Sequence, residues 1–192
     1  MNKWLHHNGL SYKQPRGVTH EFDEAKQQAF IDAYEALKVR FSEDDSIVFT
    51  DAVHPRLSIR ISHSWRRTGQ DNVIETTSNL SRLNIIGALN LSDIGATSAH
   101  DYESINSETI VRSFCELRKS DPLTHKLQII LDGDGDHSSH LPKDAAFFLN
   151  IELHSLPPHS QNLNPIECLW KVMNEKSRNN FYFKSKRNVR QR

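Results

Sequence analysis

Hydrophobic residues along the chain follow two different spacings. Some segments repeat them every three to four residues, as one face of a helix does, and other segments gather β-branched and aromatic residues in short runs. The helical spacing predicts helices over 23–40, 107–119, 138–150 and 165–180. The short runs predict strands over 46–50, 57–65, 83–91, 126–131 and 151–156.

The order of these elements predicts an α/β fold. A first helix is followed by three strands and then by helix, strand, helix, strand and helix. This order is typical of a mixed five-stranded sheet flanked by helices, in which functional groups collect beyond the carboxyl ends of parallel strands. We predict a linker or arm over 1–22, one folded domain over 23–180 and a basic tail over 181–192.

The sequence argues against a membrane span and against a zinc site built from paired cysteines. The 192 residues contain no apolar stretch of about 18 residues, so the sequence predicts no membrane span. Cys115 and Cys168 lie far apart, without the paired spacing of a zinc site, and are predicted to be reduced thiols of a cytosolic protein.

The formal net charge of zero conceals an uneven distribution. Residues 1–20 carry +3, residues 171–192 carry +7, and the body of the chain between them carries −10. An acidic body with basic ends suits a protein whose ends bind a polyanion and whose body holds cations. A solvated tail without a partner has the same pattern, so charge alone leaves both interpretations open.

The stretch LDGDGDHSSH, which begins at Leu131, invites three interpretations. Asp132, Asp134 and Asp136 match the first half of an EF-hand calcium loop, but His137 replaces its glycine and Lys143 replaces its terminal glutamate. The two histidines of this stretch have no cysteine nearby, which weakens a zinc site. The third interpretation is that Asp132 alone matters, as a carboxylate at a strand end with partners elsewhere.

Two other carboxylates can be those partners. Asp51 follows the strand predicted over 46–50, and Glu167 lies in the first turn of the last predicted helix. Taken singly, each has a simpler explanation, since strand ends carry turn carboxylates and acids stabilise helix amino termini. Taken together, three carboxylates from three elements can hold two Mg²⁺ ions about 3.5–4 Å apart.

Three stretches carry a resemblance to a known family. FTDAVHP, ILDGDGDH and LPPHSQNLNPIECLW resemble the acidic motifs of DDE transposases of the mariner superfamily, most closely those of bacterial insertion sequences, and 34 residues separate the second and third acids. The resemblance implies a ribonuclease-H-like fold. It also implies that Asp51, Asp132 and Glu167 are the catalytic residues and ligands of two Mg²⁺ or Mn²⁺ ions, with His137 and Asn164 as supporting residues.

The resemblance also implies partners and a cellular role. It implies metal-dependent cleavage at transposon ends and strand transfer into target DNA, by a homodimer in a synaptic complex, in the bacterial cytoplasm at the nucleoid. Family members carry a helix-turn-helix region before this domain, and we expect that region to be missing here. The alternative is an inactive remnant that binds DNA non-specifically through its tail. Trp65 and Trp170 are predicted to be packing residues.

Overall fold

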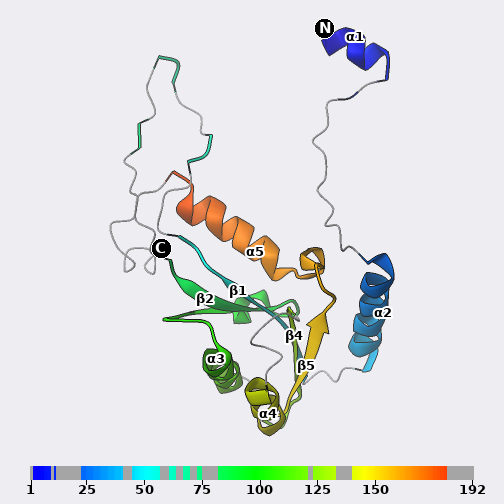
Figure 1. The fold of residues 1–192 in the computed structure, drawn as a ribbon, viewed down its shortest axis with the longest axis vertical. Coiled ribbons are helices and arrows are strands. Elements are labelled where there is room, and N and C mark those ends of the chain that lie inside the picture. The colour runs from blue at the N-terminus through cyan, green and yellow to red at the C-terminus, as the bar shows by residue number, and fades with distance from the viewer. Residues whose placement is uncertain are drawn as a thin grey trace.

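A computed structural model describes residues 2–9, 11, 23–40, 45–56, 61–63, 67–69, 73–74, 82–120, 123–132 and 140–180. In this part of the chain, one five-stranded sheet has helices on both of its faces (Figure 1). No helix among the described residues is long and apolar enough to cross a membrane.

The sheet is mixed, and its strands stand in the order β3-β2-β1-β4-β5. Strands β1, β4 and β5 run parallel to one another, whereas β2 pairs antiparallel with both β1 and β3. The strands are β1 (Ser46–Val53), β2 (Asn84–Asn90), β3 (Ser98–Tyr102), β4 (Leu127–Asp132) and β5 (Ile151–Leu156). The helices are α1 (Asn2–His7), α2 (Glu24–Arg40), α3 (Ser107–Ser120), α4 (His140–Phe148) and α5 (Ile166–Met173), the last followed by a π-helical turn, Asn174–Arg178.

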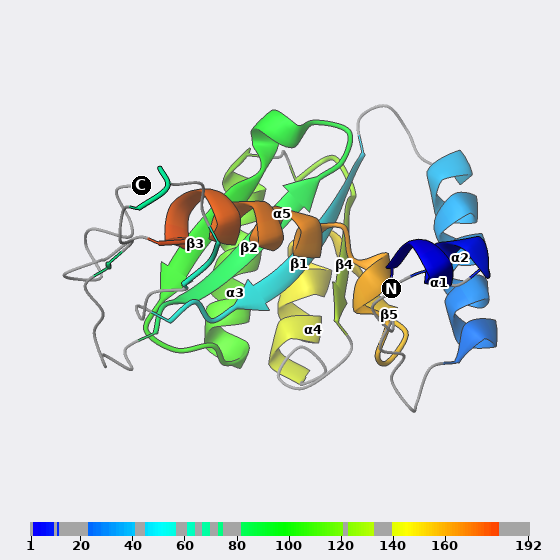
Figure 2. The same cartoon turned by 90° about the horizontal axis from the view of Figure 1, so that it is seen from above.

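Each face of the sheet has its own hydrophobic core. Helices α3 and α4 lie on one side, where Phe114 packs with Ile129 of the interior strand β4, and α5 crosses the other side (Figures 1 and 2). On this second side α2 also contributes Phe30, which packs with Phe49 of β1. Because strand residues alternate between faces, Asp51 lies on the same face as Phe49, beneath α5.

Most predicted elements are confirmed, one predicted strand is wrong where it is described, and one observed strand was not predicted. The strand predicted over 57–65 is absent from 61–63, where Ile61 is largely exposed, and its other residues lie outside the described ones. The strand that completes the sheet is β3, which the sequence analysis did not predict. Its sequence, SAHDY, has no apolar run because β3 is an edge strand with no buried residue. Helix α1 lies within the segment predicted as a linker or arm, and the predicted division of the chain into domains stays a prediction.

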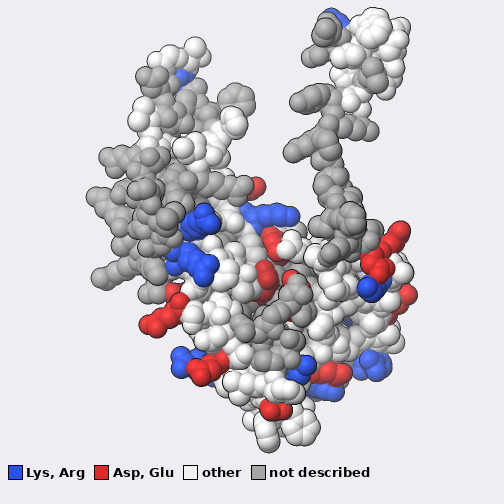
Figure 3. Space-filling model, viewed as in Figure 1, with Lys and Arg blue, Asp and Glu red and all other residues white. Residues whose placement is uncertain are grey.

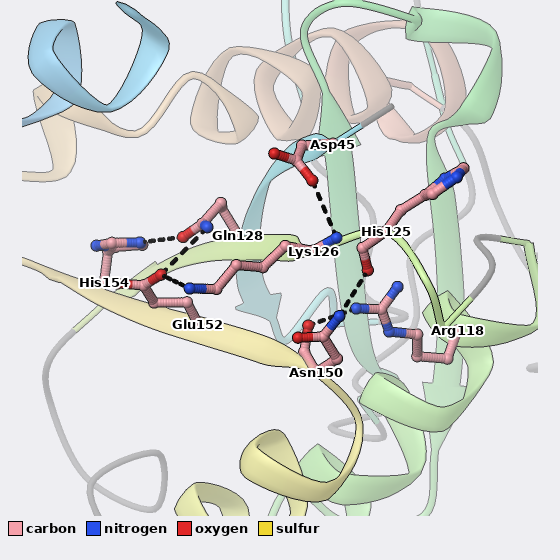
Figure 4. A network of polar contacts seen from close by, with 8 residues as sticks. All are labelled: Asp45, Arg118, His125, Lys126, Gln128, Asn150, Glu152 and His154. Carbon is pink, nitrogen blue, oxygen red and sulfur yellow. Dashed lines mark hydrogen bonds and ion pairs between the residues drawn. The ribbon is translucent and has the colours of Figure 1, made fainter. Parts of the chain in front are cut away.

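A polar network ties β4 and β5 together at the end of the sheet away from the predicted acids (Figure 4). Buried Arg118 of α3 donates to the backbone oxygens of Leu149, at 2.7 Å, and of Asn150, at 2.5 Å. Asn150 adopts a left-handed backbone, φ 52°, and its side chain donates to two carbonyls before β4. These contacts fix the tight turn between α4 and β5.

Candidate active site

Strand register places Asp51 and Asp132 next to each other. In the parallel β1–β4 pair the partners differ by 81 residues, from Ser46 with Leu127 to Phe49 with Ile130. The same offset separates Asp51 from Asp132. Both carboxylates therefore extend from adjacent strands at the same level and on the same face.

The third predicted acid, Glu167, comes from the first turn of α5. Pro165 directly precedes this helix, where its missing N–H costs no helical hydrogen bond. Ile166 and Trp170, four residues apart, are buried against the sheet, with 0% and 3% of their surfaces exposed. This buried stripe seats α5 over β1 and β2, and so holds Glu167 at the same pocket as the two aspartates.

The three acids line one open cavity of about 240 Å³. The loop between β5 and α5 completes its wall with Ser160, Gln161 and Asn164. Figure 3 shows acidic side chains at the centre of the face viewed, with basic side chains close by. The structure thus brings together Asp51, Asp132 and Glu167, which lie far apart in the sequence.

The pKa of Asp51 is higher than that of an ordinary surface carboxylate, because Asp51 is partly buried beside two other acids. Removal from water, reinforced by the charges of Glu167 and Asp132, raises the pKa of Asp51 to about 6. Hydrogen bonds oppose this rise, above all the bond that the Trp170 indole Nε1 donates to Oδ2 over 2.9 Å. A half-buried carboxylate beside two others is held at a cost in free energy, which a bound cation would offset.

Asn164, predicted as a supporting residue, fixes the start of α5. It is buried, its side-chain amide donates to the Thr50 carbonyl at 3.5 Å, and its Oδ1 accepts from the Ile166 N–H at 3.4 Å. Asn164 therefore joins the strand that carries Asp51 to the helix that carries Glu167.

A second set of hydrogen bonds, which the sequence alone did not predict, connects α2 to the loop that lines the pocket. Buried Gln27 donates to Ser160 Oγ at 2.9 Å and exchanges two hydrogen bonds of 3.2 Å with the side chain of Asn162. These bonds join residues more than 130 positions apart. The only signal in the sequence is a polar residue on a helix face that also carries Phe30 and Tyr34.

The chemistry of the pocket fits hard divalent cations. All three acids offer carboxylate oxygens, the ligands that Mg²⁺ prefers, and no described basic side chain lines this cavity. Among the residues that the structure describes, no three His, Cys, Asp or Glu side chains converge closely enough to hold one ion as they stand. His137, Asp134 and Asp136 lie outside the described residues, so the supporting role of His137 stays a prediction and the calcium-loop alternative stays untested.

Two family models match the chain. One, described as DDE superfamily endonuclease, matches residues 46–190, about three quarters of the chain. The other, described as winged helix-turn helix, matches residues 1–34. The prediction that a helix-turn-helix region is missing gains no support from this second match. A comparison with curated proteins gives no match.

Solved structures show the same fold. A Mos1 transposase paired-end complex with left transposon end superposes with a TM-score of 0.73 at 17% identity, covering 99% of this chain and 60% of that one. The mariner Mos1 paired end complex with Mg gives 0.69 at 18% identity, with coverages of 99% and 60%. The ribonuclease-H-like fold predicted from the sequence is therefore confirmed, and the chain spans about three fifths of these relatives' length.

Proposed function

Because this chain belongs to the DDE superfamily endonucleases, we propose that it acts as a transposase catalytic domain, cleaving DNA at insertion-sequence ends and transferring the strands to target DNA. One observation carries the proposal. Asp51, Asp132 and Glu167, which match the acidic motifs, come from β1, β4 and α5 and line a single cavity. Structural similarity to transposase complexes supports it at the level of the fold.

In this proposal the three carboxylates hold two Mg²⁺ or Mn²⁺ ions. Two of the similar structures are mariner Mos1 paired end complexes with Mn and with Mg. When bound, such ions lower the pKa of the attacking water or hydroxyl and stabilise the leaving oxygen of a phosphodiester.

The residues of this chain have separate tasks in the proposal. Asp51 and Asp132 present their carboxylates from adjacent strands, and Glu167 presents its own from the first turn of α5. Asn164 holds β1 and α5 together, because it bonds to the Thr50 carbonyl and to the start of α5. His137 is proposed as a supporting residue on the basis of its motif alone.

DNA is the proposed partner, both as transposon ends and as target. The basic ends of the chain, +3 and +7, would attract the phosphate backbone, and that attraction weakens with salt. A homodimer in a synaptic complex, associated with the bacterial nucleoid, follows from the resemblance to mariner transposases. Several of the similar structures are paired-end complexes, which is consistent with such a pair.

The decisive experiment measures nicking of supercoiled plasmid DNA by the 192-residue chain in Mg²⁺ or Mn²⁺, with EDTA as the metal-free reference. We expect Asp132→Asn to abolish nicking, because it removes one ligand charge from the cavity. Asp144→Asn is the matched control, since Asp144 is an exposed carboxylate of α4. Unchanged nicking by Asp132→Asn would refute the site. Salt-sensitive DNA binding without any nicking by the wild type would instead favour the inactive remnant.

A further inference from the structure

Trp170 does more than fill the core beneath α5. Its side chain is 3% exposed, and its single polar atom, the indole Nε1, lies 2.9 Å from Oδ2 of Asp51. An indole N–H can only donate, so this contact is satisfied only while the Asp51 oxygen is presented to it. The bond crosses from α5 to β1 and joins residues 119 positions apart.

Gly87 makes this position of the indole ring available. It pairs directly with Asp51 in the antiparallel β1–β2 ladder and therefore lies beneath α5. A Cβ atom at Gly87 would stand 2.3 Å from Cη2 and 2.5 Å from Cζ2 of Trp170, and 3.1 Å from Cδ1 of Ile166. Real Cβ atoms do not approach a ring so closely, so a side chain at this position would force the Trp170 ring to shift.

We propose that Trp170, seated on Gly87, is a positioning residue for the metal centre. By holding Oδ2, it prevents the Asp51 carboxylate from rotating about its last side-chain bond and keeps its remaining lone pairs directed at the cavity. This inference rests on the proposed function, because it assigns Trp170 the task of orienting a metal ligand. Residues that orient ligands typically change metal affinity or activity by about 10–100-fold when they are replaced.

Trp170→Phe tests the inference, since phenylalanine keeps an aromatic ring in the core and removes only the donor and one fused ring. The primary measurement is the Kd for Mn²⁺ without DNA, from the electron paramagnetic resonance signal of free Mn²⁺. The secondary measurement is the Mn²⁺ concentration that gives half-maximal plasmid nicking. We expect both to rise about tenfold or more in the variant, in line with the loss of an orienting contact.

A matched control separates orientation from packing. Leu89 is buried in the same cluster as Trp170 and Ile166 but makes no polar contact with the acids. Leu89→Val loosens that cluster, so it should lower the melting temperature without changing the Kd for Mn²⁺. A loss of affinity caused by looser packing would instead appear in both variants and would overturn the inference.

Gly87→Ala supplies an independent route to the same displacement. It leaves the donor in place but pushes the ring away, so it too should raise the Kd for Mn²⁺. In the double variant with Trp170→Phe, the clashing far ring atoms are absent, and the two increases should be less than multiplicative.

The outcomes distinguish this inference from the proposed function. If Asp132→Asn abolishes Mn²⁺ binding and nicking while Trp170→Phe leaves both at wild-type values, the metal site stands and the role of Trp170 is refuted. If Asp132→Asn binds Mn²⁺ as the wild type does, the metal site itself is wrong. If Gly87→Ala does not fold, the comparison of Trp170→Phe with Leu89→Val still decides the matter.

Discussion

Replacing Asp51 by asparagine should stabilise the metal-free protein. The amide has nearly the same shape as the carboxylate, and its oxygen can still accept the Trp170 hydrogen bond, so the change removes the charge and little else. That charge is unfavourable in the folded state because burial and the neighbouring acids raise its pKa to about 6 from 3.8. The prediction therefore isolates the electrostatic cost of holding Asp51 at this position.

The expected gain in stability follows from the rise in the pKa of Asp51. A rise of about two pKa units corresponds to about 3 kcal/mol at most, at about 1.4 kcal/mol per unit. Asp51 is only partly buried and faces an open cavity, so solvent screening reduces the expected gain to about 1–2 kcal/mol. For a chain of this size, this is a rise in melting temperature of roughly 2–8 °C.

The pH dependence has a definite sign. Because the folded state raises the pKa, the protonated form of Asp51 is favoured there, and the wild type loses stability as the pH rises from about 4 through about 6. Asp51→Asn lacks this loss. The two proteins should have similar stability near pH 4 and should differ by the full amount above pH 7.

Thermal denaturation followed by circular dichroism, in EDTA between pH 4 and pH 8, measures this difference. Asp144→Asn serves as the control, because it removes an exposed carboxylate far from the cavity, and its effect should not follow the same pH course. Added Mg²⁺ should raise the melting temperature of the wild type and not that of Asp51→Asn. Equal stability of the two proteins at pH 7.5, or a difference that does not change with pH, would refute the electrostatic argument.

Three further predictions concern the contacts around this centre. Gln27→Leu should lower the free energy of unfolding by about 1–3 kcal/mol and slow nicking, because Ser160 loses a buried partner beside the cavity. Gln28→Leu, at an exposed position, is the control. Equal effects of the two substitutions would contradict the role of the Gln27 hydrogen bonds. Arg118→Met should cost about 2–3 kcal/mol in urea denaturation, because the Leu149 carbonyl loses its Arg118 donor and the Asn150 carbonyl keeps only the Leu127 N–H. A cost near zero would contradict that role. Deleting residues 181–192 removes five basic residues. In fluorescence anisotropy, this deletion should reduce the slope of log DNA affinity against log salt concentration by up to about four. An unchanged slope would mean that the tail does not bind DNA.

The sequence alone predicted the elements and the acids because both depend on short-range patterns. A β-rich run ending in aspartate predicts a carboxylate at a strand end, which made Asp51 and Asp132 candidates, and the resemblance to transposase motifs then selected them. The proline-containing start of the last helix placed Glu167 in its first turn, and the same resemblance selected it as the third acid. The order of the elements predicted that both aspartates would lie at one edge of the sheet, since parallel strands present their carboxyl ends there.

Tertiary structure alone decided which other residues reach these acids. No local pattern connects Gly87 with Trp170, or Gln27 with Ser160, because close packing between distant segments has no period along the chain. The edge strand β3 was missed for a related reason, since its hydrogen bonds to β2 form it without any apolar run. Trp170 was predicted as a packing residue, which its burial confirms, but its bond to Asp51 depends on a glycine in another strand that leaves space for the ring.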